Sequence, residues 1–147
     1  MANALGIAGG LFALLTFVHF GVDWLFQSHA EAMKKHNHPW TRGIHCAVYT
    51  IGFIPVMMLF ELSEKEIWLG AIILFLSHFV EDTYIPVFLW AKYIRRPPGF
   101  VKGNTDKQDN EAFIQFIDTT LGKILMIVVD QIIHLTFLWP IVYMALN

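Results

Sequence analysis

The sequence predicts an all-α membrane protein, a four-helix transmembrane bundle with both termini on the extracytoplasmic side. Of its 147 residues, 56% are hydrophobic and only 15% are charged, which is too apolar a composition for a soluble domain of this size. Four apolar segments are also each close to the roughly 20 residues that a helix needs to cross the hydrocarbon core of a bilayer. We expect a single integral membrane domain over residues 1–147.

The boundaries of the four helices follow from the apolar segments, to within about 2–4 residues. The first segment has no Lys or Arg before it and no small-residue cleavage site, so we interpret it as a retained helix rather than a secretion signal. In the third segment Pro86 removes a backbone donor, which predicts a kink or a restart of that helix. The predicted helices cover residues 4–27, 43–62, 66–92 and 120–145.

Basic residues predict the orientation of the bundle. Nine of the ten Lys and Arg residues lie in or beside the first and third loops, residues 28–42 and 93–119, and only Lys65 lies on the other side. Because cytoplasmic loops carry the excess of Lys and Arg, these two loops are predicted to be cytoplasmic. The third loop contains two prolines and two glycines, so a helix cannot continue through it.

Composition also excludes some classes of function. The formal net charge is −2, and no patch of interleaved basic and aromatic residues is present, so the sequence gives no case for nucleic-acid binding. Cys46 is the single cysteine, which excludes an internal disulfide and any metal motif built on cysteine pairs. A metal site in this chain must therefore use His, Asp or Glu.

The predicted helices carry histidines and aspartates at a recurring spacing. An aspartate follows a histidine by four residues in the first and third helices, and the order is reversed in the fourth helix, which runs the opposite way. Residues four apart share a helix face, so the pattern predicts one deep layer of histidines and one layer of aspartates nearer the cytoplasm. The second helix adds a histidine from its cytoplasmic end. The candidate metal ligands are His19, Asp23, His45, His78, Asp82, Asp130 and His134.

Buried aspartates need partners, because each costs about 2.5–3.5 kcal/mol at the centre of a membrane helix. Imidazole and carboxylate groups are ligands for zinc, iron and manganese, and we expect one or two divalent ions, zinc first. Asp82 or Asp130, if not bound to metal, is a candidate general base. Two alternatives are a purely structural polar network and a proton or ion pathway. Haem is disfavoured, because it gains nothing from three carboxylates.

Further polar residues extend this pattern toward the cytoplasm. Glu81 is predicted to orient a ligand or to serve as a spare ligand or base. Basic residues at the cytoplasmic mouth either only follow the positive-inside bias and attract anionic lipid, or bind the phosphate-bearing headgroup of a substrate. The candidate substrate-binding residues are Gln27, Lys35, Arg42 and Arg96.

Three motifs in this order resemble an uncharacterised bacterial family of integral membrane proteins, domain of unknown function 3307. They are HxxxDWxxQ in the first helix, "HCAVY" in the second and DQxxH in the fourth. The resemblance covers most of the chain and implies a shared polar site and a bacterial or phage origin, but it implies no reaction. We expect a multi-pass protein of the bacterial inner membrane. The residues that carry the resemblance are His19, Asp23, Trp24, Gln27, Lys34 or Lys35, His45, Tyr49, Asp130, Gln131 and His134.

The leading functional hypothesis from the sequence is a metal-dependent hydrolase acting on a lipid or lipid-linked phosphate ester at the cytoplasmic leaflet. The competing hypotheses are a proton or divalent-cation transporter or channel, and a non-catalytic assembly protein with a polar core. The expected partners are membrane lipid, a lipid-linked substrate and a second copy of the chain.

Overall fold

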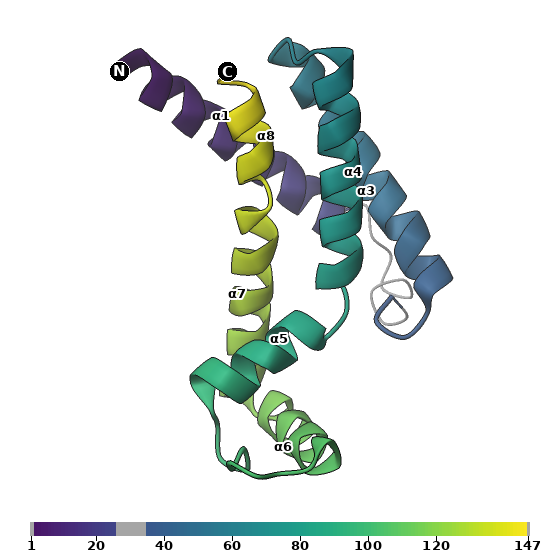
Figure 1. The fold of residues 1–147 in the computed structure, drawn as a ribbon, viewed down its shortest axis with the longest axis vertical. Helices are drawn as coiled ribbons and strands as arrows, with labels where there is room; N and C mark the ends of the chain where they lie inside the picture. The colour runs from purple at the N-terminus through teal and green to yellow at the C-terminus, as the bar shows by residue number, and fades with distance from the viewer. Residues whose placement is uncertain (1, 26–34, 147) are drawn as a thin grey trace. The chain divides into compact units, whose positions relative to one another are not determined.

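The structure is a computed structural model that describes residues 2–25 and 35–146 (Figure 1). All regular elements in these residues are helices, which confirms the predicted all-α fold class. The chain forms two compact units, Met1–Thr83 with His134–Asn147, and Tyr84–Ile133. We describe each unit by itself.

The first unit is a group of helices around an antiparallel pair. Figure 1 shows α3 and α4 side by side, joined by a short turn, with α1 and α8 also in this unit. Helix α1 continues directly into η1, a π-helical turn. The elements are α1 (Ala2–Phe20), η1 (Gly21–Leu25), α3 (Pro39–Leu59), α4 (Glu64–Glu81) and α8 (Trp139–Met144).

Local sequence signals explain the ends of α3 and α4. Pro39 occupies the first turn of α3, where its missing N–H costs no hydrogen bond. After α3, Glu61 takes a left-handed conformation at φ 56°, which reverses the chain. Ser63 and Glu66 then form a capping box, in which the Glu66 carboxylate accepts the Ser63 N–H at 2.7 Å.

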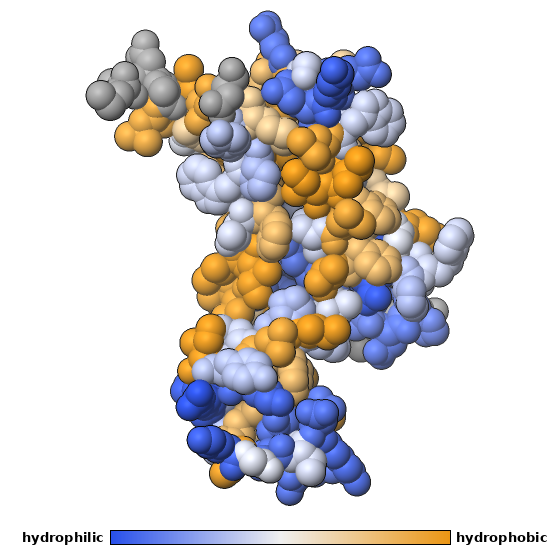
Figure 2. Space-filling model, viewed as in Figure 1, coloured by the Kyte–Doolittle hydropathy of each residue, from blue (hydrophilic) through white to orange (hydrophobic). Residues whose placement is uncertain are grey.

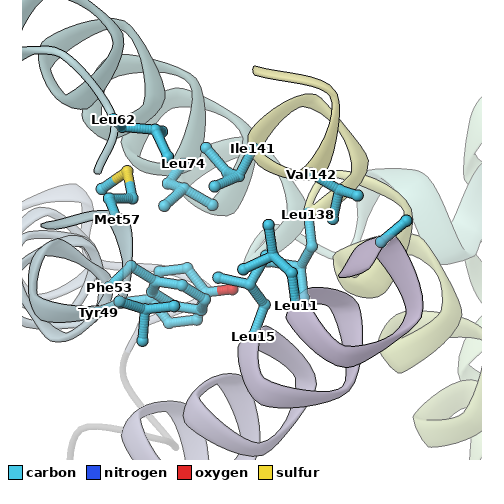
Figure 3. Packing of buried hydrophobic residues seen from close by; sticks show 12 residues of the cluster. Leu11, Leu15, Tyr49, Phe53, Met57, Leu62, Leu74, Leu138, Ile141 and Val142 are labelled. Carbon is cyan, nitrogen blue, oxygen red and sulfur yellow. The ribbon is translucent and has the colours of Figure 1, made fainter. Parts of the chain in front are cut away.

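The core of the first unit consists of apolar stripes, one from each helix (Figure 3). Tyr49, Phe53 and Met57 follow one another at four-residue spacing on α3, and each is at most 2% exposed. Residues four apart lie on one helix face, so each stripe packs as a continuous ridge. The other helices contribute Leu11, Leu15, Leu74, Leu138, Ile141 and Val142.

The second unit has a small apolar core and a polar periphery. Val87, Ala91 and Phe113 form its buried apolar cluster. Helix α6 begins with a second capping box, formed by Thr105 and Gln108. Figure 2 shows hydrophilic residues gathered over α6 and the loop before it. The elements are α5 (Ile85–Trp90), η2 (Ala91–Arg95), α6 (Asp106–Asp118) and α7 (Thr120–Thr136), whose last turn belongs to the first unit.

Three helical segments are long and apolar enough to cross a membrane: Leu5–Leu25, Pro39–Leu59 and Thr120–Met144. The pair Glu64–Glu81 and Ile85–Arg95 adds a fourth if the two helices form one broken span. Large apolar side chains are exposed along these segments, as expected where lipid replaces water (Figure 2). These spans indicate a multi-pass membrane protein.

The third and fourth predicted helices are each divided in the structure. The sequence predicted one helix over 66–92, whereas α4 ends at Glu81 and α5 starts at Ile85. Pro86 lies in the first turn of α5, which confirms the predicted restart. The predicted helix over 120–145 is likewise divided into α7 and α8, with Pro140 in the first turn of α8.

The junction of α6 and α7 provides a test of the second unit. A Cβ atom at Gly122 would overlap the backbone carbonyl of Phe116, so Gly122→Ala must displace backbone. We expect it to lower the free energy of unfolding by roughly 1–3 kcal/mol, the usual cost of overpacking. Thermal unfolding in detergent, followed by circular dichroism, measures this loss. Gly10→Ala is the control, because a Cβ at Gly10 meets nothing within 4 Å; equal melting temperatures for the two variants would contradict the tight junction.

Candidate metal centre

Four buried side chains of the first unit bring their donor atoms together: Asp23, His45, His78 and Asp82. The Nε2 atom of His45 lies 3.0 Å from Asp23 Oδ1 and 3.0 Å from His78 Nε2. His78 Nε2 lies 3.5 Å from the same aspartate oxygen. Asp82 Oδ2 lies 3.5 Å from His45 Nε2 and 3.6 Å from His78 Nε2. Each of the four residues is at most 6% exposed.

These distances match the edges of a tetrahedral zinc site. Bonds of about 2.0–2.1 Å to a tetrahedral zinc hold the ligand atoms about 3.3–3.4 Å apart. The five distances above range from 3.0 to 3.6 Å. Nitrogen and oxygen donors in this arrangement are suited to zinc, so we call these four residues the metal group.

Hydrogen bonding alone accounts less well for the same contacts. His45 Nε2 carries at most one hydrogen, yet it lies 3.0 Å both from a carboxylate oxygen and from the Nε2 of His78. A single N–H at this atom can donate to both neighbours only through a bifurcated hydrogen bond. Asp82 Oδ2 is buried and has no hydrogen-bond partner among the residues that the structure describes. A cation between the four atoms would accept a lone pair from each of them.

The metal group is positioned by the apolar stripes of the core. His78 follows the buried Leu74 by four residues on α4, and Asp82 follows His78 by four more. His45 precedes Tyr49 by four residues on α3. The packed faces therefore continue directly into the polar site. Asp23 comes from the π-helical turn η1, a distortion that is frequent at functional sites.

A second group of possible ligands shares one histidine with the first. His78, Glu81 and His134 also lie close enough to hold an ion. Glu81 Oε2 is 3.5 Å from His134 Nε2 and 4.0 Å from His78 Nδ1. His78 thus presents Nε2 to the metal group and Nδ1 to Glu81. At 4.0 Å the Glu81 carboxylate is too far from His78 Nδ1 for a hydrogen bond, so the orienting role expected of Glu81 stays a prediction.

Tyr49 joins the remaining histidine to this site. Its ring stacks on His78 with centroids 3.7 Å apart and an interplanar angle of 6°. Its hydroxyl oxygen lies 3.0 Å from His19 Nδ1. The His134 ring centroid is 4.7 Å from that of His78 and 5.5 Å from that of His19. The three histidines predicted to share a layer therefore lie together, although His19 belongs to neither ligand group.

Lys35 is the buried cation of the site. Its Nζ lies 2.7 Å from Asp82 Oδ1 and 3.6 Å from Asp23 Oδ1, and the residue is 8% exposed. The sequence predicted Lys35 to bind a substrate headgroup, but here it pairs with two predicted ligands. Its position was not visible in the sequence, because it depends on how the loop returns to the end of α4.

The segment that carries Lys35 is tied to its neighbours. The Arg42 guanidinium donates to the carbonyls of Lys35 and His36 at 3.3 and 3.2 Å, and it lies 4.4 Å from the centroid of the Phe79 ring. His36 Nδ1 donates to the Asp82 carbonyl at 2.8 Å. Arg42, another predicted headgroup ligand, thus supports the segment beside the metal group.

The charges of the two groups fit one divalent cation. With Lys35, the groups contain three carboxylates and one ammonium, so their formal charge is −2 when the histidines are neutral. An uncompensated charge inside a membrane costs several kcal/mol. One divalent ion neutralises the cluster, whereas a second would leave it positive.

A family model described as "Protein of unknown function (DUF3307)" matches residues 11–147. The chain belongs to this family. No curated protein and no solved structure matches the chain. The DUF3307 match spans every residue of the metal group, but it assigns no reaction, so the function has to be argued from the site.

Three further residues that the sequence predicted for the site of this DUF3307 protein are not part of the metal group. Asp130 belongs to the second unit and accepts a hydrogen bond from the Gln131 amide at 3.2 Å, and it is part of neither ligand group. Arg96 is also in the second unit, where it lines a cavity. Gln27 lies outside the described residues.

Removal of the Lys35 ammonium tests the charge balance. We expect Lys35→Met to destabilise the metal-free protein by about 3–5 kcal/mol, because it leaves buried carboxylates without their partner. Added zinc should then raise the melting temperature of this variant more than that of the wild type. The measurement is thermal unfolding in detergent with chelator and with zinc.

Lys107→Met is the matched control, since the exposed Lys107 lies 4.0 Å from Glu111 and such pairs contribute less than about 1 kcal/mol. A zinc-induced shift for Lys35→Met no larger than that of the wild type would show that Lys35 does not compensate the metal group.

Proposed function

We propose that this protein is a metalloprotein of the bacterial inner membrane that binds one divalent cation, zinc most readily. The observation that carries the proposal is the close approach of four buried donor atoms from Asp23, His45, His78 and Asp82, with five of their separations between 3.0 and 3.6 Å. Iron and manganese use the same ligand types, but manganese favours six oxygen-rich ligands rather than a tetrahedron of nitrogen and oxygen.

We propose further that the protein hydrolyses a phosphate ester of a lipid or lipid-linked compound at the cytoplasmic leaflet. A bound zinc acts as a Lewis acid and lowers the pKa of a coordinated water to about 7. In this mechanism Asp23, His45 and His78 would hold the ion and water would complete its coordination, while Asp82, whose Oδ2 lies 3.5 and 3.6 Å from the two histidines, would stay unbound beside it.

Asp82 has the features of a general base in this mechanism. Its Oδ1 is held by Lys35 at 2.7 Å, while Oδ2 has no hydrogen-bond partner among the described residues and lies near both histidines of the metal group. The lysine fixes the position of the carboxylate, and the second oxygen would accept a proton from the attacking water. The role of Asp130, the other predicted base, stays a prediction.

The depth of the site supports a lipid substrate. Asp23 and His45 lie within candidate membrane spans, and His78 lies in the helix pair that forms the possible fourth span. The residues of the metal group are almost fully buried. A substrate with an acyl chain can reach such a site through the hydrocarbon layer, whereas a soluble phosphate ester cannot.

Transport of protons or divalent cations is the second candidate. It is favoured by one observation, the position of His78 in both ligand groups. Donor atoms therefore continue from Asp23 across His78 to Glu81 and His134 without a gap larger than 4.0 Å. Such a chain of sites also suits an ion that moves stepwise.

Metal content tests the first proposal. Wild-type protein purified in detergent should contain close to one equivalent of zinc per chain, and Asp23→Asn and His45→Ala should lose it, because each removes a donor of the tetrahedron. Elemental mass spectrometry measures this. His38→Ala is the control, since His38 is exposed and belongs to neither ligand group. A well-folded wild type that takes up no zinc would contradict the metal site and leave a proton pathway or a structural polar core.

The Asp82→Asn variant tests whether Asp82 acts as the general base or as a metal ligand. We expect this variant to keep its metal and to lose turnover of a lipid phosphate ester by roughly 10²–10⁴-fold, the usual contribution of a general base. His45→Ala should lose both metal and turnover. Product formation is measured by mass spectrometry in mixed micelles, with metal content measured in parallel.

Two results would contradict the hydrolase mechanism. Loss of metal in Asp82→Asn would make Asp82 an essential ligand and not the base. Zinc flux into proteoliposomes without any hydrolysis product, abolished by His45→Ala, would favour transport.

A further inference from the structure

The second unit contains a basic cavity that the metal site does not use. Its volume is about 460 Å³, and it lies among η2, the loop before α6 and the first turn of α6. We call it the η2 cavity; its lining includes Lys92, Tyr93, Arg96, Phe100, Lys102 and Asn104.

The walls of the η2 cavity are held by specific contacts. Asn104 Nδ2 donates to the Gly99 carbonyl at 2.8 Å and to Asp109 Oδ1 at 2.9 Å, which closes the loop onto α6. Gly99 takes φ 101°, and a Cβ there would lie 2.9 Å from the Cβ of Ala112, so the loop packs closely on the helix. The cavity is therefore a built feature rather than a gap between exposed side chains.

The charge of the η2 cavity is positive. Its single carboxylate, Asp109, is 3% exposed and forms a salt bridge with Lys92 at 2.8 Å. The hydrogen bonds from Lys92 and Asn104 hold the pKa of Asp109 below its ordinary value, so this carboxylate stays ionised and neutralises Lys92. Arg96 and Lys102 remain as two cations of the lining. Their combined charge suits a phosphate group.

The backbone of Arg96 supports a role for its side chain. This residue takes a left-handed conformation with φ 45°, and its N–H donates to the Ala91 carbonyl at 2.8 Å. Residues other than glycine are disfavoured in this conformation, so glycine would suit the turn better. Unlike glycine, arginine has a guanidinium group, which can form bidentate hydrogen bonds with two phosphate oxygens. Its Nε donates to the Tyr93 carbonyl at 3.3 Å, which orients the group.

We propose that the η2 cavity binds the phosphate group of an anionic phospholipid through Arg96 and Lys102. The cavity includes the end of the possible span Ile85–Arg95, where lipid headgroups lie. Tyr93 and Phe100 give it an aromatic wall, which suits the boundary between headgroup and acyl chain. A free phosphate ester offers the same chemistry. The proposal does not depend on the metal group.

The test is lipid retention by the full-length protein, measured by native mass spectrometry from nanodiscs. Wild-type protein should retain phosphatidylglycerol in preference to phosphatidylcholine. Arg96→Gly keeps the left-handed backbone and removes the guanidinium, and it should weaken retention roughly tenfold or more, as loss of a charge-assisted hydrogen-bond pair does. Lys102→Gln should weaken it also, and because Lys102 is exposed in the loop this change leaves the fold intact.

Lys107→Gln is the matched control, because Lys107 is exposed on the neighbouring helix but does not line the cavity. It removes the same charge and should cause a much smaller loss. Equal losses for Arg96→Gly, Lys102→Gln and Lys107→Gln would mean general surface attraction and would overturn the site. Inorganic phosphate and phosphatidylglycerol are compared as competitors: displacement by phosphate at equal concentration would identify a free phosphate ester as the ligand and overturn the lipid assignment.

Discussion

Compensation of buried negative charge is the constraint on which the first unit depends. Asp23, Glu81 and Asp82 are each at most 4% exposed, and the unit lies largely within candidate membrane spans. A lone carboxylate there is strongly unfavourable, so helix positions must bring cations or donors to each oxygen. Lys35 supplies one positive charge, at 2.7 Å from Asp82, and three histidines supply nitrogen atoms. A divalent cation bound among these residues would complete the charge balance.

The apolar packing and the polar site are parts of one arrangement. The stripe of Tyr49, Phe53 and Met57 on α3 continues to His45, and the stripe on α4 continues from Leu74 to His78. Close packing between the apolar parts of α3 and α4 therefore fixes the distances between the polar side chains at the ends of these two helices. Tyr49 belongs to both, since its ring stacks on His78 while its hydroxyl contacts His19. Tyr49 thereby limits the rotation of His78 and helps to keep Nε2 toward the metal group.

Interrupted helices occur where the chain needs polar geometry. Asp82 is the C-terminal cap of α4, and the break before Pro86 leaves its carbonyl available to His36. Asp23 lies in a π-helical turn, and Arg96 follows another one. In each case a regular α-helix would direct the side chain differently, so a small loss of backbone regularity sets the direction of a charged group. These positions combine an irregular backbone with candidate binding roles.

The sequence by itself determined the fold class, the approximate spans and the ligand types. Apolar length and four-residue spacing are local properties, so they predicted the helices and the shared faces of His78 with Asp82. Only the tertiary structure decided which of the predicted ligands meet. Asp23, His45, His78 and Asp82 converge, His19 contacts Tyr49 instead, and Asp130 belongs to the second unit. Helix periodicity gives a face and a depth, but it does not give the rotation of one helix against another. The place of Lys35 was equally hidden, because the path of a loop depends on contacts such as that of His36 with the Asp82 carbonyl, which join residues far apart in sequence.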